Sequence, residues 1–164
     1  MIAQQLRCVC RTGLLLVMLL LVAACSGTSE RPDYSNIPAP VGSPRGQMAA
    51  QIALQQVGVL YRYGGQSPSG FDCSGLVYYS YRQAGKAVPR TTEQLWSGMT
   101  PVSNPDMQVG DVLFFSIEGK MSHVGLYLGD GRFVHAPSTG RTVSVASLTS
   151  AFYRDALIRA GRPR

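Results

Sequence analysis

The sequence predicts an α+β domain over residues 44–164, with N-terminal helices packed on a C-terminal antiparallel sheet of about five or six strands. Two observations predict this fold class. Before Pro101, apolar residues recur at three- and four-residue steps, which is typical of amphipathic helices. After Pro101 they gather in short runs separated by Gly, Asp and Ser, which is typical of strands joined by tight connections. The segment of roughly 120 residues suffices for one compact domain.

The first helix is expected to start at Ser43-Pro44, because proline is favoured at the first helical position. We expect it to end near Gly58. Its apolar stripe consists of Ala49, Ile52, Ala53, Val57 and Leu60.

Two further helices follow a turn-rich "YGGQSPSG" segment. The second is predicted over Cys73 to Ala84, with Asp72 as its N-cap and Gly85 just beyond its end. The third is predicted over Thr92 to Ser97, because the two residues at its start, Thr91 and Gln94, have the spacing of a capping box.

The predicted strands are the fragments "DVLFFS", "SHVGLYLG", "RFVHAP", "TVSVAS" and "ALIRAG". Each is rich in β-branched, aromatic or aliphatic residues and ends at turn-forming residues. We expect them to form an antiparallel meander on which the helices pack.

Residues 1–24 are predicted to be an export signal. Arg7 and Arg11 supply positive charge, Gly13 to Val22 is apolar, and the segment closes on "VAAC". The apolar run has about half of the roughly 20 residues that a membrane span needs. The ending resembles the bacterial lipobox, which implies that Cys25 becomes the lipidated first residue. Ordinary secretion without lipid is the alternative.

Residues 25–43 read as a flexible tether, because their prolines and polar residues leave little apolar surface to bury. Fully extended, such a segment reaches up to roughly 60 Å. Acyl chains on Cys25 would hold the protein at a membrane. Ser26 after the cysteine favours the outer membrane, by resemblance to sorting in bacteria with two membranes.

Charge gives little indication of nucleic-acid binding. Of the 15 Lys and Arg residues, Arg7 and Arg11 fall in the export segment, and the remaining 13 exceed the 9 acidic residues by 4. These basic residues are scattered rather than clustered in a run or stripe. We therefore expect no nucleic-acid partner.

Cys73 is the strongest candidate for chemistry. Cys8 and Cys10 lie in the export segment and Cys25 at its end, so Cys73 is the single free thiol of the predicted domain. At the first turn of a helix, unpaired N–H groups and the helix dipole favour a thiolate, and we expect a lowered pKa for Cys73. The bland interpretation is a small buried cysteine.

Both histidines of the chain, His123 and His135, flank one predicted hairpin. A thiol nucleophile needs a base that a third group orients. A two-residue turn at Asp130-Gly131 would place the rings on opposite faces, whereas a three-residue connection over residues 129–131 pairs Gly125 with His135 and puts both imidazoles on one face. We predict the three-residue connection.

These residues resemble the NlpC-type cell-wall cysteine peptidases, a papain-like family, through "YRYGG", "DCSGLV", "VPRTTEQ", "VGDVLFF" and "SHVGLYLGDGRFVHA". The resemblance implies that Cys73 is the nucleophile, that His123 is the general base and that His135 orients it. It also implies an oxyanion role for the hydroxyl of Tyr61, although packing on the sheet is the plain alternative. Asp111 is expected only to shape the turn into its strand.

The resemblance further implies a murein hydrolase that acts on peptidoglycan stem peptides, at the D-Ala to diaminopimelate crosslink or at the γ-D-Glu to diaminopimelate bond. Tethered relatives with one small domain favour the crosslink. We expect a monomer in the bacterial envelope, facing the periplasm, without cofactor or metal. Three alternatives remain: a papain-like acyltransferase, a zinc site formed by Cys73, His123 and His135, and a murein-binding lipoprotein without activity.

Overall fold

The computed structural model describes residues 42–164. The predicted signal, the lipidation site Cys25 and nearly all of the tether lie outside the described residues. The described helices are α2 (Pro44–Leu54), α3 (Cys73–Gln83), α4 (Thr92–Gly98), α5 (Ala151–Ala156) and the short 3₁₀ helix η2 (Asn104–Asp106). The strands are β1 (Gln66–Ser67), β2 (Gly70–Phe71), β3 (Met99–Val102), β4 (Val112–Ile117), β5 (Lys120–Gly129), β6 (Arg132–His135), β7 (Ser144–Ser147) and β8 (Leu157–Pro163).

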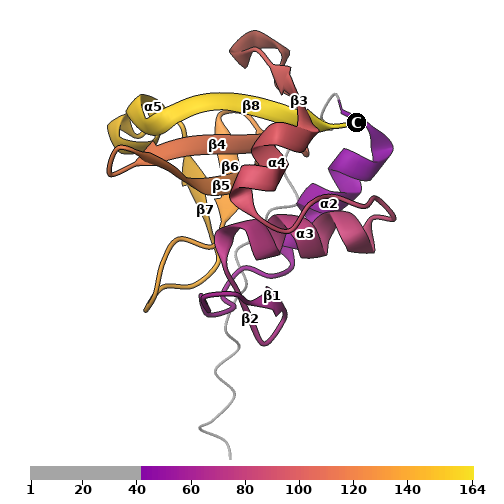
Figure 1. The fold of residues 1–164 in the computed structure, drawn as a ribbon, viewed down its shortest axis with the longest axis vertical. Coiled ribbons are helices and arrows are strands. Elements are labelled where there is room, and N and C mark those ends of the chain that lie inside the picture. The colour runs from indigo at the N-terminus through magenta and orange to yellow at the C-terminus, as the bar shows by residue number, and fades with distance from the viewer. Residues whose placement is uncertain (1–41) are drawn as a thin grey trace, which may run out of the picture. The chain divides into compact units, whose positions relative to one another are not determined.

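Six strands form one antiparallel sheet in the order β3-β8-β4-β5-β6-β7, and β1 and β2 form a separate two-stranded ribbon. Strands β4 to β7 are the expected meander, and β8 returns to pair with β4. Helices α2 and α3 pack together below the sheet, and both contact β5 (Figure 1). The predicted α+β class is confirmed, and the sheet has six strands, within the predicted five or six.

Several elements differ from the sequence prediction, and three of them affect the main sheet and the helices around it. Helix α2 ends at Leu54, and the chain turns through Gly58, whose φ of +94° is left-handed. Leu60, placed on the apolar stripe of this helix, is instead 64% exposed and pairs with Thr142. Strand β3 and helix α5 were not predicted, because neither has a clear apolar period of its own; β3 forms by pairing with β8.

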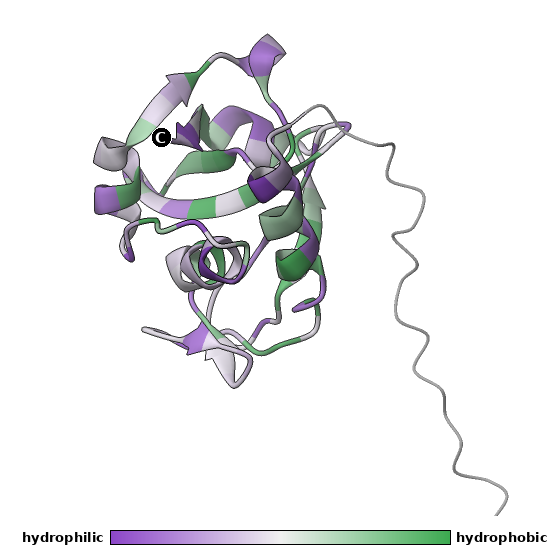
Figure 2. Ribbon diagram, turned by 90° about the vertical axis from the view of Figure 1, so that its right-hand side faces the viewer, coloured by the Kyte–Doolittle hydropathy of each residue, from purple (hydrophilic) through white to green (hydrophobic). Residues whose placement is uncertain are grey.

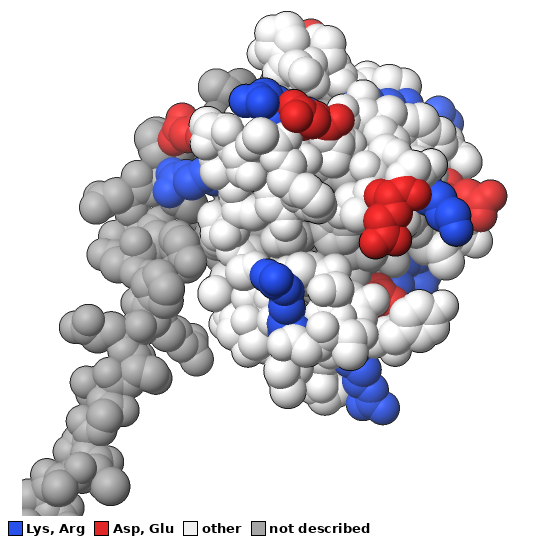
Figure 3. Space-filling model, turned by 90° about the vertical axis from the view of Figure 1, so that its left-hand side faces the viewer, with Lys and Arg blue, Asp and Glu red and all other residues white. Residues whose placement is uncertain are grey.

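The surface and the strands follow simple polarity rules. Hydrophobic and hydrophilic stretches are interspersed along the chain (Figure 2). On the face drawn in Figure 3, lysines and arginines stand apart from one another among acidic and uncharged residues, so no basic stripe crosses this face. None of the helices in residues 42–164 has both the length and the apolar character to span a bilayer.

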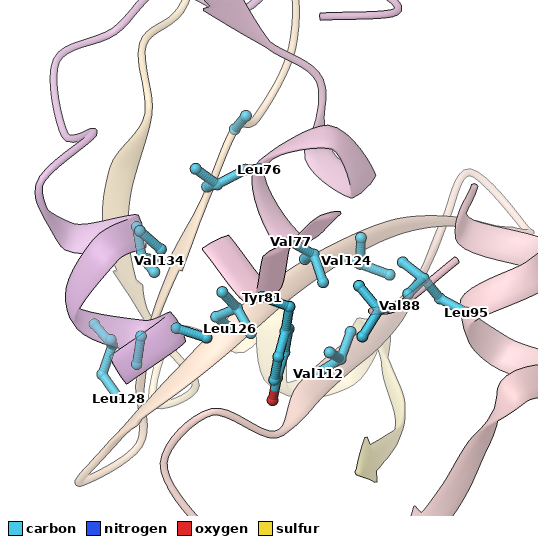
Figure 4. Packing of buried hydrophobic residues seen from close by; sticks show 14 of the residues in the cluster. Leu76, Val77, Tyr81, Val88, Leu95, Val112, Val124, Leu126, Leu128 and Val134 are labelled. Atoms are coloured by element: carbon cyan, nitrogen blue, oxygen red, sulfur yellow. The ribbon is translucent and has the colours of Figure 1, made fainter. Parts of the chain in front are cut away.

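Apolar side chains cover both faces of the sheet. On one face, Val112, Val124 and Leu126 pack against Leu76 and Tyr81 of α3 (Figure 4). The opposite face carries a smaller cluster of Leu113, Phe115, Phe133 and Ala160, covered by residues of α5 and its flanks. Burial on both faces explains why β4 reads as a continuous apolar run rather than as an alternating one.

Asp111 links the start of β4 to the end of the neighbouring strand β8. It is 2% exposed, and its two carboxylate oxygens accept hydrogen bonds from Arg162 at 2.7 and 2.8 Å. Its Oδ2 also accepts the N–H of Gln108 at 2.8 Å. The turn-shaping role expected for Asp111 is therefore present, with a partly buried ion pair to Arg162 of β8 in addition.

We expect Asp111→Ala to lower the free energy of unfolding by about 3 kcal/mol, because it strands the Arg162 guanidinium and the Gln108 N–H. Denaturant unfolding measures the change. As a matched control, Asp155→Ala removes an exposed pair to Arg154 and should change stability by less than about 1 kcal/mol. Equal effects of the two substitutions would contradict the role assigned to Asp111.

Candidate active site

Helix α3 begins at Cys73 because Asp72 caps it. The Asp72 backbone is extended, and its Oδ1 accepts the N–H of Gly75 at 2.6 Å. Its Oδ2 also accepts the N–H of Gly64 at 3.0 Å, which ties the preceding turn to the helix start. The predicted cap is confirmed, and Cys73 lies at the first helical position as expected.

Arg90 fixes this helix start from a distant part of the chain. Its guanidinium donates to both Asp72 oxygens at 2.9 and 2.7 Å, to Ser74 Oγ at 2.9 Å and to the Gly65 carbonyl at 3.1 Å. A bidentate guanidinium–carboxylate pair of this kind is strong and directional. Arg90 lies within the quoted "VPRTTEQ" fragment, but sequence reasoning gave it no role.

Two glycines allow the turn to approach the helix closely. A Cβ atom at Gly75 would lie 1.9 Å from the Gly65 carbonyl oxygen. This distance is too short for any side chain to be accommodated. The glycine two residues after the cysteine is thus required by backbone-to-backbone packing. This packing holds the turn in place beside Cys73.

The Cys73 sulfur lies against strand β5. Its Sγ is 3.9 Å from the carbonyl oxygen of Ser122, the residue before His123, and 4.0 Å from Thr92 Oγ1 at the start of α4. The backbone N–H groups of Ser74 and Val124 also interact with the sulfur. No hydrogen bond joins the sulfur to an imidazole within residues 42–164. Ser122 is the extra residue of a register shift between β4 and β5, so its carbonyl is free of the ladder.

The two histidines lie on one face of the sheet and are hydrogen-bonded to each other. His123 Nε2 lies 2.8 Å from His135 Nδ1. Leu126 pairs with Val134 across β5 and β6, so the next position along the ladder brings Gly125 beside His135. The predicted pairing and common face are confirmed.

The predicted three-residue connection, however, is wrong. Strand β6 starts at Arg132, so the turn has two residues, Asp130 and Gly131, and both have positive φ. The odd residue that restores the register lies within β5, where the pairing shifts between Tyr127 and Gly129. A β-bulge thus does what the longer loop was expected to do.

Aromatic rings surround the histidine pair. His123 lies 6.0 Å from Phe115, and His135 lies 5.1 Å from Phe133 and 5.4 Å from Tyr153 of α5, measured between ring centroids. Gly125 leaves room for this packing, since a Cβ there would meet a Phe133 ring carbon at 2.7 Å. His123 is 5% exposed and His135 is 2% exposed.

Burial keeps both imidazoles neutral. It lowers the pKa of His123 to about 4. Burial also lowers the pKa of His135 to about 3, with further contributions from His123 and the Arg141 guanidinium. At neutral pH, His123 is therefore a free base whose Nε2 is occupied by His135, which leaves Nδ1 as the nitrogen available to a thiol.

The lowered thiol pKa expected from the sequence is not what the structure gives. Burial raises the pKa of Cys73, and the Asp72 carboxylate adds to the increase. The Val124 and Ser74 N–H groups and the Thr92 hydroxyl act in the opposite direction, but they do not outweigh burial. The resting thiol is therefore protonated, beside neutral imidazoles.

Tyr61 is positioned by a short backbone ladder. Its N–H donates to the Arg141 carbonyl at 2.8 Å, next to the Leu60–Thr142 bridge. Burial raises the pKa of its phenol, and the Cys73 and Asp72 charges add to the increase. Tyr61 is thus a protonated donor near the thiol, as well as a residue that packs on the core.

An open pocket of about 430 Å³ adjoins the histidine pair. Its walls include His123, His135, Tyr153, Phe152, Arg141 and Glu118. Sequence reasoning assigned no role to the last four, and they come from three segments that only the fold brings together. No group of three or more His, Cys, Asp and Glu side chains within residues 42–164 is arranged to hold a metal ion.

A helix-borne cysteine beside a sheet-borne histidine pair, within this α+β architecture, defines a papain-like domain. The NlpC/P60 family model matches residues 58–162, and the chain belongs to this family. The match includes Tyr61, Cys73, His123 and His135.

Individual relatives agree with this assignment. Murein DD-endopeptidase MepH of Escherichia coli is 37% identical over 126 residues, covering 71% of this chain and 46% of that protein. Gamma-D-glutamyl-L-lysine dipeptidyl-peptidase of Bacillus subtilis is 38% identical over 104 residues, covering 62% and 35%. The solved NlpC/p60 domain of the peptidoglycan hydrolase SagA is 35% identical with a TM-score of 0.63, covering 71% of this chain and 97% of that domain. The chain spans less than half the length of the two curated relatives.

We expect stability to fall as the pH is lowered from about 6.5 to about 4. The unfolded chain takes up protons on both histidines near their ordinary pKa, whereas the folded pKa values are about 4 and 3, so protonation favours unfolding throughout this window. Denaturant unfolding at several pH values measures the slope. His135→Gln should make the slope shallower, and an unchanged slope would show that the buried pair does not cause it.

We expect alkylation of Cys73 by iodoacetamide to be slow at pH 7 and to rise roughly tenfold for each pH unit above it, because only the thiolate reacts. Mass spectrometry of the Cys73-containing peptide separates this thiol from Cys25. A rate already at its maximum near pH 6 would show a resting thiolate and contradict the protonated state.

Proposed function

We propose that this chain is a peptidoglycan hydrolase, a cysteine peptidase that cleaves a peptide bond next to diaminopimelate. The observation that carries the proposal is the position of Cys73 at the capped start of α3, 3.9 Å from the backbone of the strand that bears His123. The His123–His135 hydrogen bond at 2.8 Å supplies the oriented base. Membership of the NlpC/P60 family supports the same chemistry.

In the proposed mechanism, His123 Nδ1 accepts the S–H proton as Cys73 Sγ attacks the scissile carbonyl carbon. A base that accepts on Nδ1 carries its own proton on Nε2, so Nε2–H donates to His135 Nδ1. His135 thereby fixes both the tautomer and the ring orientation of His123. His123 then returns the proton to the leaving amine, and water hydrolyses the thioester.

The proton moves only when substrate is present. Burial favours the neutral thiol and the neutral imidazoles, so charge separation at rest is disfavoured. The hydrogen bond between thiol and base has to form as the thiol turns from the Ser122 carbonyl to the neighbouring His123. Catalytic hydrogen bonds commonly tighten in this way when substrate binds.

Two donors support the negative charge that develops on the carbonyl oxygen. The backbone N–H of Cys73 has no partner among the described hydrogen bonds, since the Asp72 side chain takes the N–H of Gly75 and the Asp72 carbonyl takes that of Leu76. The Tyr61 hydroxyl is the second donor. A well-placed donor of this kind lowers the activation barrier by on the order of 3 kcal/mol.

Both bonds next to diaminopimelate suit a thiol peptidase. One relative is named for the bond between D-amino acids, and another for the γ-D-glutamyl bond to a diamino acid. We favour the crosslink, because a tethered enzyme of one small domain would reach the adjacent wall.

We further propose that the protein is a lipoprotein, acylated on Cys25, held at the outer membrane and facing the periplasm. The "VAAC" ending at residues 22–25, the serine that follows and the proline-containing segment over residues 25–43 support this arrangement. Metabolic labelling with palmitate would detect the lipid, and Cys25→Ala should abolish the label.

We expect Cys73→Ala to reduce the release of muropeptides from purified murein by at least about 10³-fold, because no other described group can form the covalent intermediate. Mass spectrometry of the fragments identifies the bond, and new amine and carboxyl ends without a second acceptor distinguish hydrolysis from acyl transfer. Thr100→Ala, on the exposed strand β3, is the matched control. Undiminished release by Cys73→Ala would refute the mechanism, and inactivity of both proteins would indicate a murein-binding protein.

A further inference from the structure

The pocket beside the histidines has a definite chemical character. His123 and His135 line it, together with Phe152, Arg141 and Glu118. It therefore combines the base of the proposed mechanism with an aromatic surface, one cation and one anion.

Arg141 is held at the pocket by its backbone and has its charge free for a ligand. Its N–H donates to the Ser138 carbonyl at 3.1 Å, and its carbonyl accepts from Tyr61. No ion pair within residues 42–164 involves Arg141 or Glu118. The positive charge lies close to His135, since it contributes to the lowered pKa of this histidine, and it opposes the increase that burial causes in the pKa of Tyr153.

The apolar part of the pocket is an exposed aromatic side chain. Phe152 is 58% exposed although it is large and apolar, and it packs against Tyr153 with ring centroids 5.0 Å apart. Ile117, at the end of β4, lines the same pocket. A chain of methylene groups that crosses this surface would be removed from water.

The position of the base assigns the pocket to one half of the substrate. In the proposed mechanism His123 returns the thiol proton to the leaving amine, so that amine lies within hydrogen-bond reach of His123. The residue that carries the amine therefore extends to the histidine side of Cys73. The pocket lies on that side, since both histidines line it and Cys73 does not.

We infer that this pocket binds the diamino acid that carries the leaving amine, with its free carboxylate paired to Arg141 and its methylene chain against Phe152. The inference rests on the proposed function. A guanidinium and a carboxylate form two parallel charge-assisted hydrogen bonds, which discriminate a carboxylate from a carboxamide of the same shape. Glu118 takes the second ammonium group where that group is not part of a peptide bond.

The test compares two synthetic crosslinked peptides that differ only in the free carboxyl group of diaminopimelate, which is a carboxylate in one and a carboxamide in the other. We expect wild-type kcat/KM to be about 10- to 100-fold higher for the carboxylate, as charge-assisted hydrogen bonds imply. Arg141→Gln should bring the ratio close to one. Using the ratio removes any effect of Arg141 on His135 that both substrates share.

Arg132→Gln is the matched control, because Arg132 pairs with Asp130 and does not line the pocket; it should retain the wild-type preference. A wild-type ratio near one, or a preference that survives Arg141→Gln, would overturn the inference while leaving the hydrolase intact.

Isothermal titration calorimetry of the same two peptides with the Cys73→Ala variant measures binding to the pocket without catalysis. Tighter binding of the carboxylate that Arg141→Gln abolishes would support the pocket even if wild type cleaved neither peptide. In that case only the proposed function would fail. Equal binding of both peptides would overturn the inference.

Discussion

The close contact between the start of α3 and strand β5 is the constraint on which the site depends. Cys73 comes from a helix and the histidines come from a sheet, so their chemistry requires these two layers to meet at one point. Gly75 permits the turn before the helix to approach within van der Waals distance. Arg90 then fastens that turn to the Asp72 cap through charged hydrogen bonds. Any side chain at position 75 would separate the turn from the helix that carries the thiol.

The same close packing determines the charge state of the site. Excluding water disfavours every charged form, and the thiol and both imidazoles are consequently neutral at rest. The helix dipole argument from the sequence had the correct sign, since the Ser74 N–H does lower the pKa of Cys73. Burial is the larger effect. A protonated thiol is also less easily oxidised than a thiolate.

The sequence predicted the local features of this site because short-range patterns determine them. Asp72 and Thr91 are cap residues with characteristic spacing, and both caps form. Parity along the strands predicted that the histidines share a face. The bulges at Ser122 and near Leu128 were not predictable, because they arise where sheet twist and packing compete with regular pairing. Arg90 and Arg141 were also missed, since their roles depend on contacts with segments far away in the chain.

One short ladder connects the two halves of the site. Residues 58–61 pair with residues 141–143, and within this ladder the Tyr61 N–H donates to the Arg141 carbonyl. The Tyr61 phenol lies close enough to Cys73 and Asp72 for their charges to raise its pKa, and the Arg141 guanidinium lies close enough to His135 to lower the pKa of that imidazole. A hydrogen bond of 2.8 Å between their backbones thus joins the proposed oxyanion donor to the cation of the proposed carboxylate site. Because both side chains extend from one hydrogen-bonded backbone pair, we expect a substrate that binds Arg141 to be brought into register with Tyr61, so that binding on the leaving side positions the bond that is to be cut.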